Sequence, residues 1–174
     1  GGKVADTAPG GDTASGWRPD LVCPGDDGCA TNDGPLEAGA SARDITPTCF
    51  EQWDDADGNG EWSRTDEAYF DCGCDQLCEG DDGWPGADDG EADGEFQAAW
   101  LAGFGQSRAA NGVHDPLWAR SVVFRTGDTS VAVVSLDLVG WFYDDALAIR
   151  ARAAELGADV DLVVVQSTHQ HEGP

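Results

Sequence analysis

A block of acidic residues in the first half of the chain sets the strongest limit on how it can fold. Half of the 34 Asp and Glu residues lie between Glu51 and Glu95, where Arg64 is the only basic residue. Carboxylates repel one another and lose hydration when they are buried, so such a block cannot pack unless its charge is neutralised. The segment therefore either stays solvated and disordered, as blocks of like charge often do, or folds around cations.

Aromatic residues within and beside the block favour the folded alternative. Disordered segments are poor in aromatic side chains, whereas this one carries Trp53, Trp62, Tyr69, Phe70, Trp84 and Phe96. Neutralisation of the carboxylates by bound calcium would let these rings pack. We expect any such calcium to be structural, because oxygen-ligated calcium holds loops together and offers little acid chemistry of its own.

The ligand order of a calcium loop is present in residues 55–66. Oxygen-bearing side chains occupy positions 1, 3 and 5, glycine occupies position 6, and a backbone carbonyl is available at position 7. The predicted ligands are Asp55, Asp57, Asn59, Glu61 and Asp66. Position 12 departs from the pattern, because Asp66 stands where a bidentate glutamate is usual; Glu67, one residue on, is the alternative ligand.

A second, weaker copy of this order lies in residues 89–96. Asp89, Glu91 and Asp93 stand at positions 1, 3 and 5 and Gly94 at position 6, but no acidic residue follows at position 12. Any further ligands would have to come from elsewhere in the chain. We include these three carboxylates among the candidate calcium ligands.

All six cysteines lie in the first half of the chain. They are Cys23, Cys29, Cys49, Cys72, Cys74 and Cys78. An even number in a loop-rich acidic segment favours disulfides and an oxidising location, which is secreted, periplasmic or at the cell surface. Zinc binding by the compact 72–78 cluster is the alternative, although no pair has the C-x2-C spacing of zinc knuckles. Six cysteines allow 15 pairings, and the sequence does not choose among them.

Charge and composition divide the chain and exclude some partners. The net charge of −25 argues against nucleic acid and anionic membranes as partners. Residues 1–22 are rich in Gly, Ala, Thr, Ser and Asp and predict a flexible tether. Residues 23–174 predict one folded domain, in which about 49–97 form an acidic, cysteine-rich insert stabilised by disulfides and calcium.

Hydrophobic patterns outside the insert predict an α/β fold, with α+β as the alternative. A weak strand covers Leu36–Ile45, and strands at Trp118–Phe124 and Val131–Leu138 form a hairpin. A helix follows, capped by Asp144 or Asp145, with Ala146, Ile149, Ala153 and Leu156 on one face and Gly157 as its stop. The next strand, Val160–Val165, completes a right-handed βαβ unit in a mixed sheet.

Two histidines follow the last strand. Side chains alternate along a strand, so His169 and His171 would share a face and could approach one zinc ion. The alternative is that both are polar loop residues. Ligands bind beyond the carboxyl ends of parallel strands, where Asp137 also lies. We treat Asp137 as a candidate acceptor for an imidazole N–H, with a simple turn residue as the alternative.

Four segments together resemble the amino end of neutral (non-lysosomal) ceramidases. They are Ala42-Arg43-Asp44-Ile45-Thr46-Pro47, the stretch from Gly103-Phe104-Gly105 to Gly112-Val113-His114-Asp115-Pro116-Leu117-Trp118-Ala119-Arg120, Ser135-Leu136-Asp137-Leu138, and Ser167-Thr168-His169-Gln170-His171-Glu172-Gly173-Pro174. The resemblance covers roughly Glu37 to Pro174 without the insert. The last segment is the most specific, although Glu172 stands where serine is common.

The resemblance implies a zinc-dependent hydrolase that cleaves the amide bond of ceramide. It implies His169 as a zinc ligand and His171 as a second ligand or a catalytic residue beside the reaction centre. From its position at the strand end, we also count Asp137 among the candidate catalytic residues. The remaining zinc ligands and the catalytic serine motif of the family lie downstream of Pro174. We therefore expect this chain to be inactive alone and to need a carboxyl-terminal remainder or a second chain.

Two functions from different classes follow. The first is the amino-terminal part of an exported zinc amidase acting on a lipid-like amide substrate. The second is an extracellular calcium-binding structural or filament-forming protein that reuses the amidase-like scaffold and can self-assemble.

Overall fold

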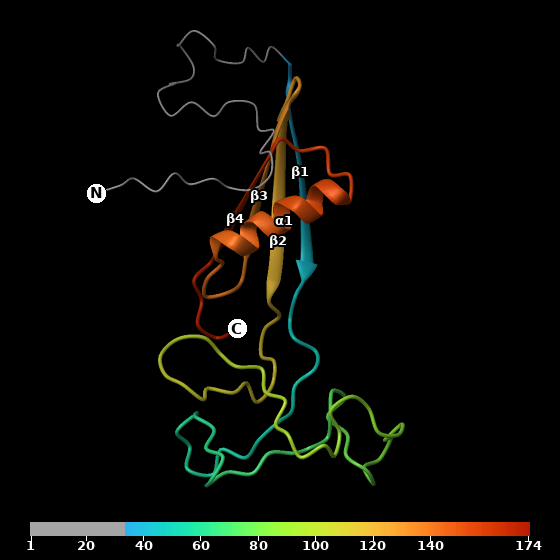
Figure 1. Ribbon diagram of the computed structural model, residues 1–174, viewed down its shortest axis with the longest axis vertical. Helices are drawn as coiled ribbons and strands as arrows, with labels where there is room; N and C mark the ends of the chain where they lie inside the picture. Colours follow the sequence, from blue (N-terminus) through green and yellow to red (C-terminus); the bar gives the residue numbers. More distant parts are fainter. Residues whose placement is uncertain (1–33) are drawn as a thin grey trace, which may run out of the picture.

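The computed structural model describes residues 34–174, which form one mixed four-stranded sheet with a single helix and a long irregular segment (Figure 1). The strands are β1 (Leu36–Asp44), β2 (Trp118–Thr126), β3 (Thr129–Leu136) and β4 (Leu162–Ser167), and they lie side by side in that order. Helix α1 (Tyr143–Glu155) connects β3 to β4. The predicted tether and the cysteines Cys23 and Cys29 lie outside the described residues.

Strand pairing confirms the expected mixed sheet. β1 pairs antiparallel with β2, β2 pairs antiparallel with β3, and β3 pairs parallel with β4 through α1. The hairpin closes at Thr126 opposite Thr129, with Gly127 at a φ of 54° in the tight turn. Since parallel neighbours need a crossover connection, the helix between β3 and β4 gives the strand–helix–strand unit.

Helix α1 begins two or three residues earlier than predicted. Its N-cap is Phe142, which makes no side-chain cap hydrogen bond, while Asp144 and Asp145 lie in the first turn. The prediction that one of these aspartates is the cap is therefore wrong, but both lie where a carboxylate is favoured by the helix dipole. The stop is as expected, because Gly157 has a left-handed φ of 76° just after the helix.

One face of the sheet carries the core and the other face is open. Ala132, Leu136 and Val163 are buried, and Arg150 of α1 donates from Nε to the Val163 carbonyl at 2.9 Å. The alternate residues project to the opposite face, where Leu162 and Val164 of β4 are exposed. All of β1 is exposed. The described residues therefore cover only part of the sheet.

The acidic insert folds without regular helix or strand. It lies beyond the carboxyl end of β1 and the amino end of β2 (Figure 1). Phe50, Glu51, Trp53, Cys72 and Gly73 are its buried residues, and Trp53 donates from Nε1 to the Ala109 carbonyl at 3.1 Å. Four further rings pack together, with neighbouring ring centroids 4.5–6.4 Å apart; they are Trp62, Tyr69, Phe96 and Trp100. The segment is thus a folded unit built on aromatic contacts.

Two disulfides tie the insert, joining Cys49 to Cys74 and Cys72 to Cys78. This result supports the disulfide interpretation over zinc for the 72–78 cluster and indicates an oxidising environment. Pairing of the remaining two cysteines stays a prediction. No helix within residues 34–174 is long and apolar enough to cross a membrane.

Candidate functional site

The histidine motif lies at the carboxyl end of β4, beside the end of β3. β4 ends at Ser167, and His169 then takes a left-handed φ of 60°. The backbone N–H of Thr168 still donates to Leu136, and that of His169 to Leu138. The two histidines are therefore not on a regular strand, which corrects the reason given for their proximity. Their rings are nevertheless adjacent, with centroids 5.0 Å apart and planes at 78°.

Both imidazoles are held through the same nitrogen. Nδ1 of His169 lies 2.7 Å from the Val139 carbonyl oxygen, and Nδ1 of His171 lies 3.0 Å from the Ala102 carbonyl oxygen. A carbonyl only accepts hydrogen bonds, so each Nδ1 carries a proton, and in the neutral imidazole each Nε2 then keeps its lone pair. Metal-ligating histidines characteristically donate their other ring nitrogen in this way.

Residues 101–108 form the wall against His171. Gly103 has a φ of 76°, and a Cβ at that position would lie 2.0 Å from Nδ1 of His171, so only glycine allows the imidazole to sit there. Phe104 packs on the His171 ring at 4.4 Å between centroids. Arg108 donates from Nη1 to the His171 carbonyl at 3.0 Å and pairs through Nη2 with Glu172 at 3.3 Å.

Asp137 makes other contacts than the expected one. Its Oδ2 accepts hydrogen bonds from the Trp118 backbone N–H at 3.0 Å and from Arg120 Nη1 at 2.7 Å. Its backbone carbonyl accepts from Gln170 Nε2 at 2.7 Å. The Nδ1 positions of both histidines are occupied by backbone carbonyls instead. Asp137 thus fixes the histidine loop through Gln170, and a direct catalytic role stays a prediction.

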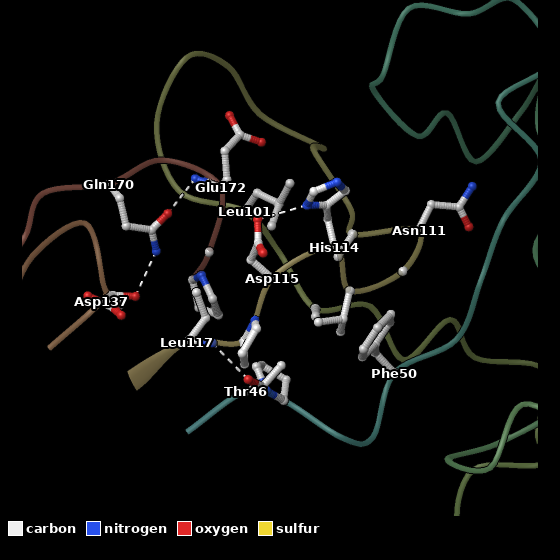
Figure 2. A pocket seen from close by; sticks show the side chains of 18 of the residues that line it. Thr46, Phe50, Leu101, Asn111, His114, Asp115, Leu117, Asp137, Gln170 and Glu172 are labelled. Atoms are coloured by element: carbon white, nitrogen blue, oxygen red, sulfur yellow. Dashed lines mark hydrogen bonds and ion pairs between the residues drawn. The ribbon is translucent and has the colours of Figure 1, made fainter. Parts of the chain in front are cut away.

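A cavity of about 490 Å³ adjoins the motif (Figure 2). Its apolar wall includes Phe50, Leu101, Val113 and Leu117, and Gln170 and Glu172 of the histidine motif also line it. This volume is within the usual range for small-molecule pockets. The exposed pair His114 and Asp115, joined at 2.8 Å, also lies along the cavity.

The histidine pair does not form a complete metal site with other described residues. Within residues 34–174, the one group of three or more His, Cys, Asp or Glu donors close enough to share an ion is Asp55, Asp57 and Glu67. A catalytic zinc needs about three protein ligands. The donor chemistry of His169 and His171 suits zinc, but at least one ligand would have to come from outside this part of the chain.

The predicted calcium loop has the hydrogen-bond pattern of a preformed ligand ring. Asp55 accepts from the backbone N–H groups of Asn59 and Gly60 at 3.0 and 3.1 Å, and Asp57 accepts from that of Asn59 at 3.0 Å. The Asn59 side-chain oxygen accepts from the Glu61 N–H at 2.6 Å. Gly60 has the left-handed φ of 74° that the turn at position 6 requires.

The carboxylate that closes this loop is Glu67 and not Asp66. Glu67 joins Asp55 and Asp57 with ligand oxygens within 4.8 Å of one another. Asp66 instead accepts hydrogen bonds from Ser63 and Thr65, whose hydroxyls lower the pKa of its carboxyl. Glu67 Oε1 is buried and has no hydrogen-bond partner. A buried, unpaired carboxylate oxygen is costly, and a cation would satisfy it.

The acidic residues of the second calcium-loop pattern, in residues 89–96, do not come together as a set of metal ligands. Glu91 accepts from Trp84 Nε1 at 3.1 Å, and Asp93 accepts from Gln97 Nε2 at 2.9 Å. The carboxylate that accepts the Asp93 and Gly94 backbone N–H groups is that of Asp71, which the ligand spacing did not indicate. Asp89 joins no group of metal donors within residues 34–174.

Sequence reasoning missed the wall of residues 101–108 as a support for His171. The run Gly103-Phe104-Gly105 was part of the family resemblance, but its spacing alone carried no signal of contact with a motif more than 60 residues later.

No family model, curated protein or solved structure matches this chain.

Proposed function

We propose that this chain is the amino-terminal part of an exported, zinc-dependent amidase that hydrolyses the N-acyl bond of ceramide-like lipids. The observation that carries the proposal is the adjacency of His169 and His171, each with Nδ1 donated to a backbone carbonyl. This arrangement leaves two Nε2 lone pairs free in one place, as a pair of zinc ligands requires.

The sequence similarity to neutral ceramidases points to the same residues. When bound, zinc would polarise the scissile carbonyl and lower the pKa of water. His169 and His171 would hold the ion, and a further ligand would come from a carboxyl-terminal remainder or a second chain. Asp137 would keep Gln170, and with it the histidine loop, in place.

The neighbouring cavity supports a lipid-like amide as substrate. Its wall of Phe50, Leu101, Val113 and Leu117 suits an apolar chain, and Gln170 places amide hydrogen-bonding groups at its edge. Burial of apolar area contributes about 25 cal/mol per Å². An acyl chain in this cavity would present its amide beside the histidine motif.

The test is hydrolysis of a fluorescent N-acylsphingosine by the protein that contains this chain together with its carboxyl-terminal part. His169→Ala should abolish release of the fatty acid and lower the zinc content. Asp128→Ala is the control, because Asp128 is exposed in the turn between β2 and β3 and does not line the cavity. Hydrolysis that persists in His169→Ala, or its absence in the parent with zinc bound, would contradict the proposal.

A second candidate is supported by a separate observation. The Asp55, Asp57 and Glu67 group, the two disulfides and the open sheet face fit an extracellular calcium-stabilised structural protein that assembles with itself. Light scattering with and without calcium distinguishes the candidates. Large assemblies that dissociate in a calcium chelator, together with no zinc at the histidines, would favour this second function.

A further inference from the structure

We propose that calcium bound at Asp55, Asp57 and Glu67 controls the position of His171 through residues 101–108. The proposal names a regulator of the histidine site and rests on the proposed function only for its zinc readout. Its physical basis is a continuous set of hydrogen bonds and ring contacts from the calcium loop to the imidazole.

The calcium loop itself meets two independent criteria. Its three carboxylates offer ligand oxygens within 4.8 Å of one another, and Glu67 Oε1 is buried with no hydrogen-bond partner. Three carboxylates this close repel strongly unless a cation lies between them. Oxygen donors of this kind prefer calcium.

One peptide unit joins the calcium loop to the wall. In the calcium-loop order the Glu61 carbonyl is the ligand at position 7. The N–H of the same peptide unit belongs to Trp62 and donates to the Ser107 carbonyl at 2.7 Å. Ligation of the carbonyl polarises the peptide and strengthens the hydrogen bond on its other side. Calcium therefore fixes Ser107.

Residues 101–108 carry this constraint to the histidine. The Leu101 N–H donates to Arg108 at 2.7 Å, which closes the segment into a loop. Within it the Ala102 carbonyl accepts from Nδ1 of His171, and Phe104 packs on the same ring. The Ala102 N–H donates to Gly173, so the loop holds the histidine motif at two points.

Calcium should therefore order the loop and raise zinc affinity without touching zinc. Partners of this type change metal affinity by about tenfold to a hundredfold. By linkage, zinc should tighten calcium binding by the same factor. Loss of calcium should free the wall and leave the His171 tautomer unselected.

The experiment measures amide hydrogen exchange at Trp62, Leu101 and Ala102 in the 174-residue chain, in calcium and in a calcium chelator, with zinc absent. Exchange should slow in calcium, by up to about a hundredfold at a calcium concentration 100 times the Kd. Asp55→Asn/Asp57→Asn should abolish the effect. The control Glu79→Gln/Asp82→Asn removes the same charge. Both side chains are exposed and make no hydrogen bond to another residue within 34–174, so this variant should keep the slowing of exchange by calcium.

A second variant distinguishes loss of the coupling from misfolding of the chain. Phe104 is 81% exposed, so Phe104→Ala should fold and bind calcium normally. Calcium should still slow exchange at Trp62 in this variant, but its effect on the His171 ring resonances should fall. Calcium that binds without changing exchange at Leu101 and Ala102, or fails to bind at all, would overturn the proposal.

Zinc titration separates this inference from the proposed function. The titration uses the protein that contains this chain together with its carboxyl-terminal part. If calcium slows exchange and moves the His171 resonances but zinc does not bind to that protein, the coupling stands and the amidase proposal fails. If zinc binds with the same affinity with and without calcium, the amidase proposal stands and the coupling is contradicted.

Discussion

The imidazoles of His169 and His171 lie 5.0 Å apart between centroids, and each is oriented by a hydrogen bond from Nδ1 to a backbone carbonyl. The two carbonyls belong to different segments, Val139 after β3 and Ala102 in the irregular part of the chain. Two independent segments therefore select the same tautomer. Two unconstrained loop histidines would not be expected to have the same ring nitrogen hydrogen-bonded to a backbone carbonyl.

Gly103→Ala should displace His171. The new Cβ would lie 2.0 Å from Nδ1 of His171, so the ring has to move and lose its bond to Ala102. We expect zinc affinity to fall at least about tenfold, the lower end of the effect of losing a supporting partner. Calorimetric zinc titration measures it.

The control for this change is Gly157→Ala. Gly157 has the same left-handed φ of 76°, but a Cβ there would meet nothing within 4 Å. This control should lose about 1–2 kcal/mol of stability from backbone strain alone and keep its zinc affinity. Equal zinc affinity in both variants would show that the contact with Gly103 does not position His171.

Glu51→Gln should change how stability depends on pH. Burial raises the pKa of the Glu51 carboxyl, the N–H groups of Gln97 and Gly73 lower it, and Asp71 and Asp93 raise it. Folding therefore favours the protonated form, and this contribution is present below about pH 4.3, the ordinary value for glutamate. It is lost as pH rises through the folded pKa.

Urea unfolding between pH 3.5 and 7 in a calcium chelator tests this sign. The free energy of unfolding of the parent, relative to Glu51→Gln, should fall as the pH rises. A difference that is constant with pH, or that grows in favour of the parent, would show that the Glu51 pKa is not raised in the folded protein.

The two disulfides should contribute unequally. The residues of Cys49–Cys74 are separated by 25 positions and those of Cys72–Cys78 by 6. Replacing the first pair by alanines should cost about 3.5 kcal/mol and the second about 2 kcal/mol, because a longer closed loop loses more entropy. Thermal or denaturant unfolding of the two double variants measures the order. The opposite order would show that enthalpic strain or residual structure outweighs loop entropy here.

Much of the sheet could be predicted from the sequence. The hairpin followed from two β-branched runs around Gly127 and Asp128, and the parallel pairing of β3 and β4 followed from the helical pattern between them. These signals are local, with periods of two or about 3.6 residues. The calcium-loop order was also local, and its carboxylates Asp55 and Asp57 are brought together.

The choice between Asp66 and Glu67 stayed open in the sequence, because ligand spacing does not encode the local hydrogen bonds of Ser63 and Thr65 to the Asp66 carboxylate. The other features depended on contacts more distant in sequence. Arg120 likewise binds Asp137. The wall against His171 is formed by Ala102 and Gly103, about 70 residues earlier in the chain. Neither alanine nor glycine is a residue type that indicates a contact with a histidine.

Binding of zinc by Nε2 of both His169 and His171, as proposed here, is tested most directly by a long-range ¹H–¹⁵N NMR spectrum of the three histidines. Without metal, His169 and His171 should show the Nδ1–H tautomer. On addition of zinc in calcium-containing buffer, the Nε2 resonances of these two histidines should shift together, while those of His114 should not. Nε2–H tautomers in the metal-free chain, or zinc shifts confined to His114, would contradict the account.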